Sequence, residues 1–117
     1  MTVNRWDVWL ANLDPVIGSE QGKTRPVLIL SISKLNGVLP VVNVLPITSR
    51  KAGRKRIYPN EALLPQNTAG LPNESIVQCY QIRTLDKQRL IRRYGALTDK
   101  ILQDQVIAAL EFQLGIK

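Results

Sequence analysis

The sequence predicts a mainly β protein: a small barrel or strongly bent sheet with one C-terminal α-helix packed on it. Two observations predict this fold. Short runs rich in β-branched and aromatic residues, separated by Pro and Gly, occupy most of the 117-residue chain. The stretch between Gly95 and Gly115 instead lacks both Pro and Gly and carries apolar residues at helical spacing. This length allows one domain, 1–117, and leaves no room for a second.

The first two predicted strands flank a polar loop. Segment 6–10 has the aromatic and β-branched content of a strand, and Asp14-Pro15 then begins a loop that runs to about Thr24. Segment 26–31 is a continuous apolar run of strand length, which predicts a buried strand. Pro26 stands at its first position, where a strand tolerates a missing N–H.

The later elements alternate between strands and irregular segments until the helix begins. Asn36-Gly37 is a hairpin-type turn signal. In chain order we then predict a strand at 41–45 that ends near 46–49, a basic loop at 50–60 with a short edge strand at 56–58, an irregular segment at 64–73, and strands at 75–82 and 90–94. Thr98 is the predicted N-cap of a helix of about four turns. Its apolar positions are Ile101, Leu102, Val106, Ala109, Leu110 and Phe112.

Histidine is absent from the sequence, which excludes several kinds of chemistry. There is no Ser-His or Cys-His nucleophile pair, no His-ligated metal and no imidazole acid–base couple. The single cysteine, Cys79, excludes an internal disulfide and a Cys-based zinc site, and it fits a reducing cytosol. No apolar run approaches the roughly 20 residues of a membrane span, and no secretory leader is evident, so we expect a cytoplasmic protein without membrane contact.

The positive charge is concentrated in two parts of the chain. Sixteen Lys and Arg residues against nine acids give a net charge of +7, and ten of the sixteen cations lie within 50–56 and 83–93. Such clustering favours a polyanionic partner, although a basic loop can also be a solvated tip. Since there is no helix-turn-helix pattern and few aromatic residues for stacking, a short single-stranded RNA held through its phosphates fits best.

The segment 18–26 is the most informative stretch for chemistry. It places a carboxylate, an amide, two hydroxyls and two cations between a turn and the buried strand. Arg25 directly precedes the apolar run, so a rigid element anchors its backbone. The alternative is that Glu20 and Arg25 form only a loop salt bridge, a common surface arrangement.

This segment, written Gly18-Ser-Glu-Gln-Gly-x-x-Arg-Pro26, belongs to a set of motifs that resembles the MazF/PemK family of toxin–antitoxin endoribonucleases. The other motifs are Arg5-x-Asp-Val-Trp9, Leu13-Asp-Pro15, Pro46-Ile-Thr48-Ser49 and Gln81-Ile-Arg83-Thr-Leu-Asp86-Lys-Gln-Arg89-Leu90. The resemblance extends from about residue 3 to residue 114. One departure is Trp6, which stands where the family commonly has Gly.

The resemblance implies an SH3-like barrel of the CcdB/PemK type with a C-terminal helix, forming a homodimer. It also implies a ribonuclease that cuts single-stranded RNA at short sequence motifs without a metal or other cofactor. A small acidic MazE-like antitoxin would neutralise the toxin by laying a flexible tail in the same basic groove. Arg25 and Thr48 fall where the family carries its catalytic pair, and Gln81 falls in a segment that lines the substrate groove.

Cleavage without a metal most simply uses the neighbouring 2′-OH to attack phosphorus. Arg25 suits stabilisation of the phosphorane, because its planar fork matches phosphate oxygens, and Thr48 can donate to the same oxygens. Glu20 is the carboxylate best placed in the sequence to act as a base or to orient Arg25. The expected substrate-binding residues are Ser19, Gln21, Lys23, Arg50, Lys51, Arg54, Lys55, Gln81 and Arg83.

Two other functions remain open for a protein of this fold. One is a non-catalytic toxin that inhibits DNA gyrase, as CcdB-like proteins do, and the other is a catalytically silent RNA-binding barrel. The presence of Arg25 and Thr48 together with the loop motif argues against both, so an endoribonuclease is the favoured prediction.

Overall fold

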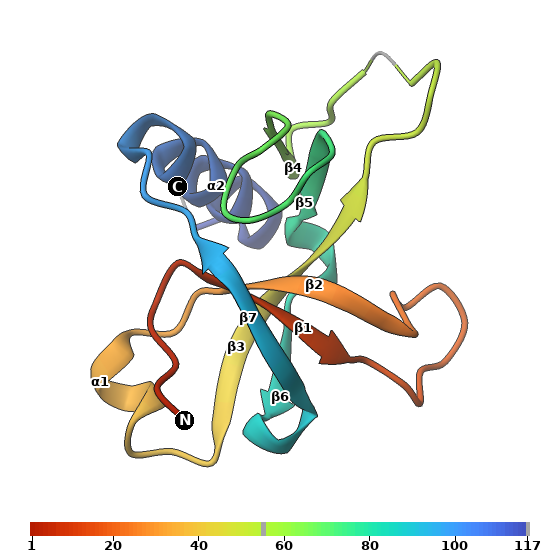
Figure 1. Ribbon diagram of the computed structural model, residues 1–117. Coiled ribbons are helices and arrows are strands. Elements are labelled where there is room, and N and C mark those ends of the chain that lie inside the picture. The colour runs from red at the N-terminus through yellow and green to blue at the C-terminus, as the bar shows by residue number, and fades with distance from the viewer. Residues whose placement is uncertain (55, 117) are drawn as a thin grey trace.

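The structure is a computed structural model, and it describes residues 1–54 and 56–116. These residues form seven strands and a long C-terminal helix (Figure 1). In chain order the elements are β1 (Asp7–Asn12), β2 (Thr24–Ile29), α1 (Ser33–Asn36), β3 (Val41–Ser49), β4 (Glu61–Leu64), β5 (Ser75–Gln78), η1 (Cys79–Gln81), β6 (Arg83–Asp86), η2 (Lys87–Arg89), β7 (Leu90–Ala96) and α2 (Lys100–Leu114). No helix in the described part of the chain is long and apolar enough to cross a membrane.

The strands form one bent antiparallel sheet around β3. Its order is β4-β5-β3-β2-β1-β7, and β6 pairs with β3 off this path. The long strand β3 changes partner along its length: the first part pairs with β6, the middle with β2, and the last part with β5. As a result β4, β5 and α2 lie on one side of the molecule and β6 on the other (Figure 1). The predicted class, a mainly β and barrel-like fold with a C-terminal helix, is confirmed.

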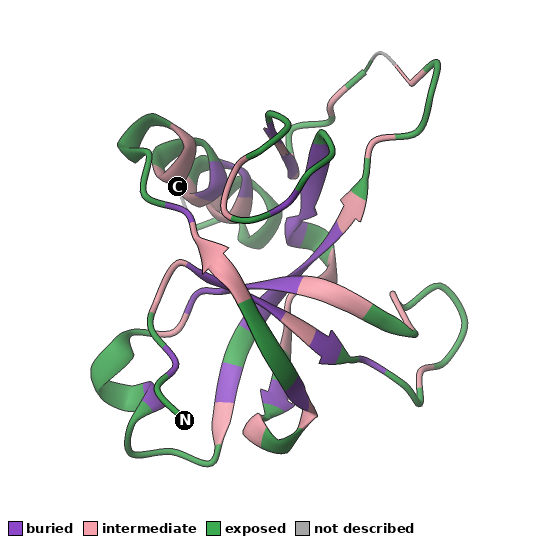
Figure 2. Ribbon diagram, in the orientation of Figure 1, coloured by how far each residue is buried: buried purple, intermediate pink, exposed green. Residues whose placement is uncertain are grey.

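The apolar run in β2 is buried because its two faces contact two different cores. Leu28 packs with Val8 in a core that Val106 of α2 covers. Val27 packs with Trp9 in a second core on the opposite face of the strands. Figure 2 shows this burial along the crossing strands. Since burial of each large aliphatic side chain contributes about 1.5–3 kcal/mol, the two cores together fix the register of β1, β2 and β3.

The terminal helix α2 is capped at both ends, and its N-cap lies one residue after the predicted one. The carboxylate of Asp99 accepts hydrogen bonds from the backbone N–H of Ile101 at 2.9 Å and of Leu102 at 3.2 Å, so Asp99 and not Thr98 is the N-cap. A carboxylate also interacts favourably with the positive end of the helix dipole. Gly115 ends the helix with a φ of 67°, the left-handed conformation that glycine adopts readily.

Asn36-Gly37 does not form the predicted hairpin turn. Asn36 ends the short helix α1, and its buried amide donates to the carbonyls of Val3 at 3.2 Å and Ser31 at 2.9 Å. The asparagine therefore joins the N-terminal segment to the connection after β2. A pattern that is common in turns has here a tertiary role.

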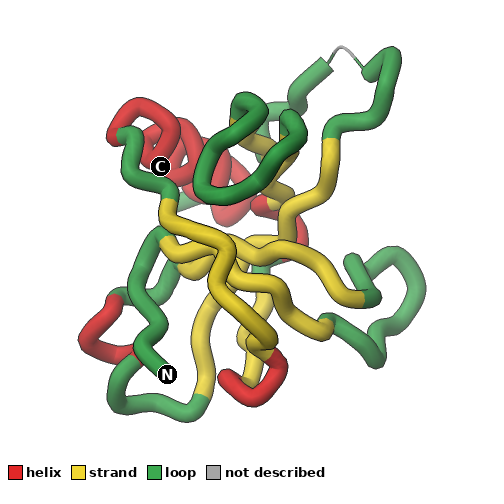
Figure 3. The backbone as a smooth tube through the Cα atoms, in the orientation of Figure 1, coloured by secondary structure: helices red, strands yellow, loops and turns green. Residues whose placement is uncertain are grey.

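Strand β3 ends at Ser49, within the range 46–49 where its end was predicted. Two other strand boundaries differ from the prediction. Segment 56–58 is not a strand, since the Tyr58 N–H donates to Glu61 Oε1 in a loop, and β4 begins only at Glu61 (Figure 3). The strand predicted over 75–82 ends at Gln78, where the 3-10 turn η1 redirects the chain into β6.

Trp6 adopts a backbone conformation that is unusual for its residue type. Its φ is 75°, in the left-handed region that glycine enters without a steric penalty. Two hydrogen bonds hold it there: its N–H donates to Ile29 O, and its carbonyl accepts from Leu97 N, both at 2.8 Å. The ring packs against the core beneath α2, and the guanidinium carbon of Arg5 lies 5.2 Å from its centroid. The departure from glycine in the opening motif thus falls on a strained position.

Candidate active site between β2 and β3

Arg25 and Thr48 lie opposite each other at the point where β2 and β3 separate. The β2–β3 register pairs Ile29 with Val44, Leu28 with Leu45 and Val27 with Pro46. Continued by two positions, this register brings Arg25 to Thr48, but β3 has by then turned to pair with β5. A hollow of about 350 Å³ opens between the diverging strands, and both side chains line it. The predicted catalytic pair is therefore brought together by sheet register.

The local sequence explains why the strands diverge here. Pro46 is the β3 member of the last β2–β3 pair and Pro26 is the next residue of β2, and neither can donate a backbone hydrogen bond. Arg25 still pairs through its backbone with fully buried Ala11 of β1, so its Cα is rigidly placed. Its Nε donates to Gly22 O at 3.3 Å, and within the described residues neither terminal guanidinium nitrogen has a hydrogen-bond partner. Both can therefore donate to a bound phosphate.

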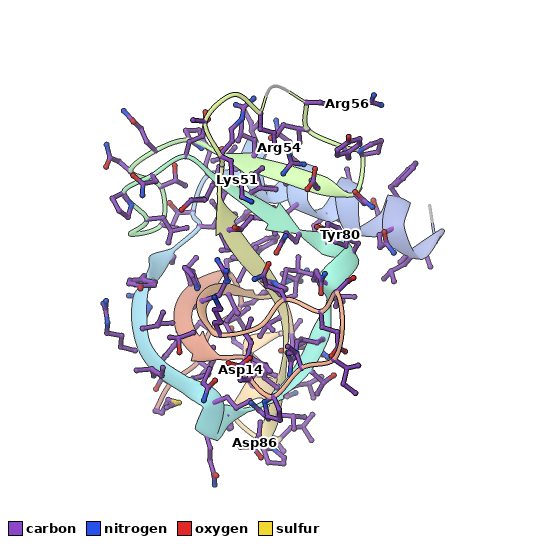
Figure 4. All side chains as sticks on the ribbon, turned by 90° about the vertical axis from the view of Figure 1, so that its right-hand side faces the viewer. Asp14, Lys51, Arg54, Arg56, Tyr80 and Asp86 are labelled. Carbon is purple, nitrogen blue, oxygen red and sulfur yellow. The ribbon has the colours of Figure 1, made fainter. Side chains whose placement is uncertain are left out.

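A second hollow continues the first one toward the basic loop. It has a volume of about 340 Å³ and shares Arg25, Thr48 and Ser49 with the first. We call the two hollows together the groove. Figure 4 looks onto this side of the molecule, with Lys51 and Arg54 above the loop that follows β1, and Tyr80 beside it. The residues that only the second hollow contributes are Gln21, Lys51, Arg54 and Gln78.

Gln81 holds the 18–23 loop next to the groove. Its Oε1 accepts from the backbone N–H of Gln21 at 3.0 Å, and its Nε2 donates to the Ser19 carbonyl at 3.0 Å. The backbone of Lys23 closes the base of the loop, because its N–H donates to Asp14 Oδ1 at 2.8 Å and its carbonyl accepts from Leu13 N at 2.8 Å. The side chains of Ser19 and Lys23 are exposed and do not line the groove.

Glu20 lies outside the groove. Its Oε1 accepts from the backbone N–H of Ile17 at 2.6 Å, which closes a turn within the loop. The side chain lines a separate hollow of about 260 Å³ with Gln81 and Arg83. No ion pair among the described residues involves Glu20, so the simple loop salt bridge to Arg25 is not formed.

Two arginines of the basic loop are paired with acids from other elements. Arg50 Nη1 lies 3.0 Å from Glu74 Oε1, and Arg54 Nη2 lies 2.5 Å from Glu61 Oε1. The hydrogen bond with Glu61 raises the pKa of Arg54, against the opposing effect of desolvation. Lys51 lines the groove and forms no ion pair with any described residue, whereas Lys55 lies outside the described residues. The loop thus offers less free charge than its composition indicates.

Arg83 forms a hydrogen bond to the start of the loop after β1. Its Nη1 donates to the Leu13 carbonyl at 3.1 Å, and its side chain lines the same separate hollow as Glu20. The sequence predicts Arg83 as a substrate-binding residue, and in the structure it does not line the two hollows of the groove. Its contact is supporting, because it fixes the chain at the start of the loop after β1.

The groove also contains residues that the sequence did not single out. Arg92 and Tyr94 of β7 line the first hollow, with the guanidinium carbon of Arg92 4.5 Å from the Tyr94 ring centroid. Asn73 and Ser75 line the same hollow from the segment before and the start of β5. Arg92 belongs to the basic cluster at 83–93, and its spacing of two residues from Tyr94 on β7 indicates that both side chains lie on one face of the strand.

A bent sheet that presents a guanidinium and a hydroxyl over a cationic groove defines a class of small β proteins suited to hold a phosphodiester chain. The model of one family, described as PemK-like, MazF-like toxin of type II toxin–antitoxin system, matches residues 4–114, so the chain belongs to this family. The family predicted from the motifs is thereby confirmed.

The chain is also similar to individual members of this family over nearly their whole length. Endoribonuclease EndoA of Bacillus subtilis is 37% identical over 116 residues, which cover 99% of this chain and 97% of EndoA. Endoribonuclease MazF of Staphylococcus saprophyticus is 39% identical over 114 residues, covering 97% of this chain and 92% of that protein. A crystal structure of MazE-MazF from Deinococcus radiodurans matches with a TM-score of 0.74 at 29% identity, covering 100% of this chain and 99% of the other.

Proposed function

We propose that this toxin is a metal-independent endoribonuclease that cuts single-stranded RNA. The observation that carries the proposal is the convergence of Arg25 and Thr48 on one open groove whose walls supply further cations. The relatives named as endoribonucleases support it, at 37% and 39% identity. A gyrase inhibitor of the same fold and a silent RNA-binding barrel are less favoured, since the relatives that match over nearly the whole chain are both named as endoribonucleases.

The proposed reaction is a transesterification followed by release of the product. The 2′-oxygen of the ribose attacks the adjacent phosphorus, its proton passes to a base, and the P–O5′ bond breaks while the 5′-oxygen takes up a proton. The products are a 2′,3′-cyclic phosphate and a 5′-hydroxyl. Arg25 stabilises the charge that develops on the phosphorane through its free terminal nitrogens, and Thr48 donates to the same oxygens.

Of the two roles expected for Glu20, the geometry favours positioning over proton transfer. Its carboxylate is engaged with the Ile17 N–H and faces a hollow separate from that of Arg25. Glu20 then orders the turn that leads into the loop bordering the groove. Gln21 and Lys51 line the groove itself and are proposed to contact the substrate directly.

The natural partner of this toxin is proposed to be a small acidic antitoxin whose flexible tail occupies the groove in place of RNA. Complementary charge would bring the two together, because the toxin carries +7 overall. We further propose that the toxin acts in the cytoplasm as a homodimer. A mass measurement in solution that gives two chains supports the dimer, and one that gives a single chain would contradict it.

The experiment that tests the activity incubates purified protein with a long RNA in excess EDTA. Cleavage by the wild type, and its loss in Arg25→Ala and reduction in Thr48→Ala, is the expected result. Analysis of the fragment ends should find cyclic phosphates and 5′-hydroxyls. Intact RNA with the wild type, equal cutting by Arg25→Ala, or 5′-phosphate ends would each contradict the proposal. A parallel supercoiling assay with DNA gyrase tests the non-catalytic alternative.

A further inference from the structure

Gln78 is a buried side chain with an unused hydrogen-bond acceptor. It is the last residue of β5 and only 8% exposed. Its Nε2 donates to the hydroxyl of Tyr80 at 3.2 Å, but within the described residues its buried Oε1 has no hydrogen-bond partner. Buried carbonyl oxygens in proteins are almost always hydrogen-bonded, so an unpaired one needs an explanation.

The place of Gln78 supplies that explanation. Its side chain lines the second hollow of the groove, together with Arg25, Thr48 and Lys51. The bond to Tyr80 engages the amide nitrogen, so the buried Oε1 is the group of this lining side chain that is left without a partner among the described residues. In this it differs from its neighbours in the hollow, most of which are cations or hydrogen-bond donors.

The ligand of such an acceptor must carry a donor. A phosphate oxygen is itself an acceptor, and Arg25, Lys51 and Arg54 already offer donors to phosphates. A nucleobase does carry suitable donors, because adenine, cytosine and guanine each present an exocyclic amino group. Uracil has no exocyclic amino group: its donor on the pairing edge is the ring N3–H, and a carbonyl oxygen stands where cytosine carries its amino group. At that exocyclic position uracil would face Oε1 with a second acceptor.

We propose that Gln78 is a specificity-determining residue: its Oε1 accepts a hydrogen bond from the exocyclic amino group of a base next to the cut. This inference rests on the proposed ribonuclease function and adds which part of the substrate the groove reads. A site that leaves a buried polar atom unpaired with the wrong base discriminates strongly, since the right base repays the cost and the wrong base does not. Tyr80 acts here as a positioning residue that holds the amide.

The test compares the cleavage motifs of variants on one long RNA of mixed sequence. In Gln78→Met, which has similar volume but no acceptor, the preference against uracil at one position of the motif should fall about tenfold or more, while the other positions keep theirs. Gln78→Glu should retain the preference, because a carboxylate still accepts. Gln88→Met, an exposed glutamine on η2, is the matched control and should leave the motif unchanged.

Several outcomes would overturn the inference. The first is an unchanged cleavage motif in Gln78→Met. The second is a uniform loss of rate in Gln78→Met without any change in base preference, which would indicate a ribose or structural contact. The third is loss of the base preference in Gln78→Glu, which would indicate that the Gln78 amide acts as a donor. Thermal melts of each variant verify folding. If the wild type cuts no RNA at all, the proposed function fails and this inference with it, whereas the outcomes above leave that function intact.

Discussion

The side chain of Gln81 bonds to the loop around Gln21 across sixty positions of the sequence. Its amide oxygen accepts from Gln21 N and its amide nitrogen donates to the Ser19 carbonyl, each at 3.0 Å. One residue of η1 therefore uses both ends of its amide to set the position of the loop that borders the groove. The loop leads directly into β2, where Arg25, the proposed phosphate-binding residue, lies four positions after Gln21.

Removal of this anchor should reduce activity more than stability. We expect Gln81→Ala to lower the rate of RNA cleavage about ten- to a hundredfold, because displacement of groove residues by about 1 Å is enough for such losses. Single-turnover cleavage measures the rate, and hydrogen exchange at Ser19 to Gln21 measures loosening of the loop. Gln88→Ala is the control, and wild-type cleavage by Gln81→Ala would show that the loop is held by other contacts.

The ion pair of Arg54 and Glu61 should contribute more to stability than that of Arg50 and Glu74. The Glu61 side chain is 3% exposed, against 45% for Glu74. Because the Glu61 carboxylate is buried, little solvent screens its ion pair with Arg54, and the carboxylate also accepts from the Tyr58 N–H at 3.1 Å. We therefore expect Glu61→Gln to cost about 1–3 kcal/mol and Glu74→Gln about 0–1 kcal/mol. Urea unfolding of the two variants decides between them, and equal costs would contradict the expectation.

Cys79 should be unreactive in the folded protein and should weaken the fold at alkaline pH. Burial, with a smaller effect of the Glu61 charge, raises the pKa of its thiol from an ordinary 9.0 to about 12. The unfolded chain therefore loses this proton first as the pH rises, and stability that is complete below pH 9 falls between pH 9 and 12.

The measurement compares the wild type with Cys79→Ala in urea unfolding at pH 8 and pH 10. Between pH 8 and pH 10 the free energy of unfolding of the wild type should fall by about 1 kcal/mol more than that of Cys79→Ala. In addition, a thiol reagent at pH 8 should label the native protein slowly and the urea-unfolded chain rapidly. Rapid labelling of native protein would show that the thiol is accessible.

The left-handed backbone at Trp6 predicts an unusual order of stabilities. Both Trp6→Gly and Trp6→Ala lose the packing of the ring, but only glycine adopts a φ of 75° without strain. We expect the glycine variant to be about 1 kcal/mol more stable than the alanine variant, the reverse of the usual order in regular structure. Chemical denaturation of both gives the difference, and a more stable alanine variant would contradict the strain.

Lys51 should contribute to the salt dependence of RNA binding. A phosphate contact releases counterions, so Lys51→Ala should reduce the slope of log K against log salt by about 0.7, the value for one contact with a single strand. Lys100, which pairs with Asp104 on α2, is the control, since it lies outside the groove. Fluorescence anisotropy with a 2′-deoxy oligonucleotide avoids cleavage during the titration, and an unchanged slope would remove Lys51 from the phosphate contacts.

Local patterns were sufficient to predict much of this protein. Local residue types largely determine the secondary structure of three segments: the apolar run after Arg25, the aromatic and β-branched segment around Trp9, and the C-terminal segment without Gly or Pro. The predicted loop before Thr24 and the pair of Arg25 and Thr48 followed from motifs attached to those stretches. The turn predicted at Asn36 was wrong because a tertiary contact with Val3 decided that position. The start of the helix differed by one residue because two adjacent side chains, Thr98 and Asp99, could each cap it, and Asp99 does.

The sequence by itself determined the class of fold, the family and the candidate catalytic pair, because strand patterning and short motifs are written in neighbouring residues. Only the tertiary structure decided which charges stay free and which polar atoms face the groove. Glu61 pairs with Arg54, Glu20 bonds within its own turn and not to Arg25, and Gln78, which lines the groove, keeps a buried amide oxygen without a partner among the described residues. Gln78 comes to line the groove because β3 leaves β2 to pair with β5, and that register is set by two cores assembled from residues distant in the chain.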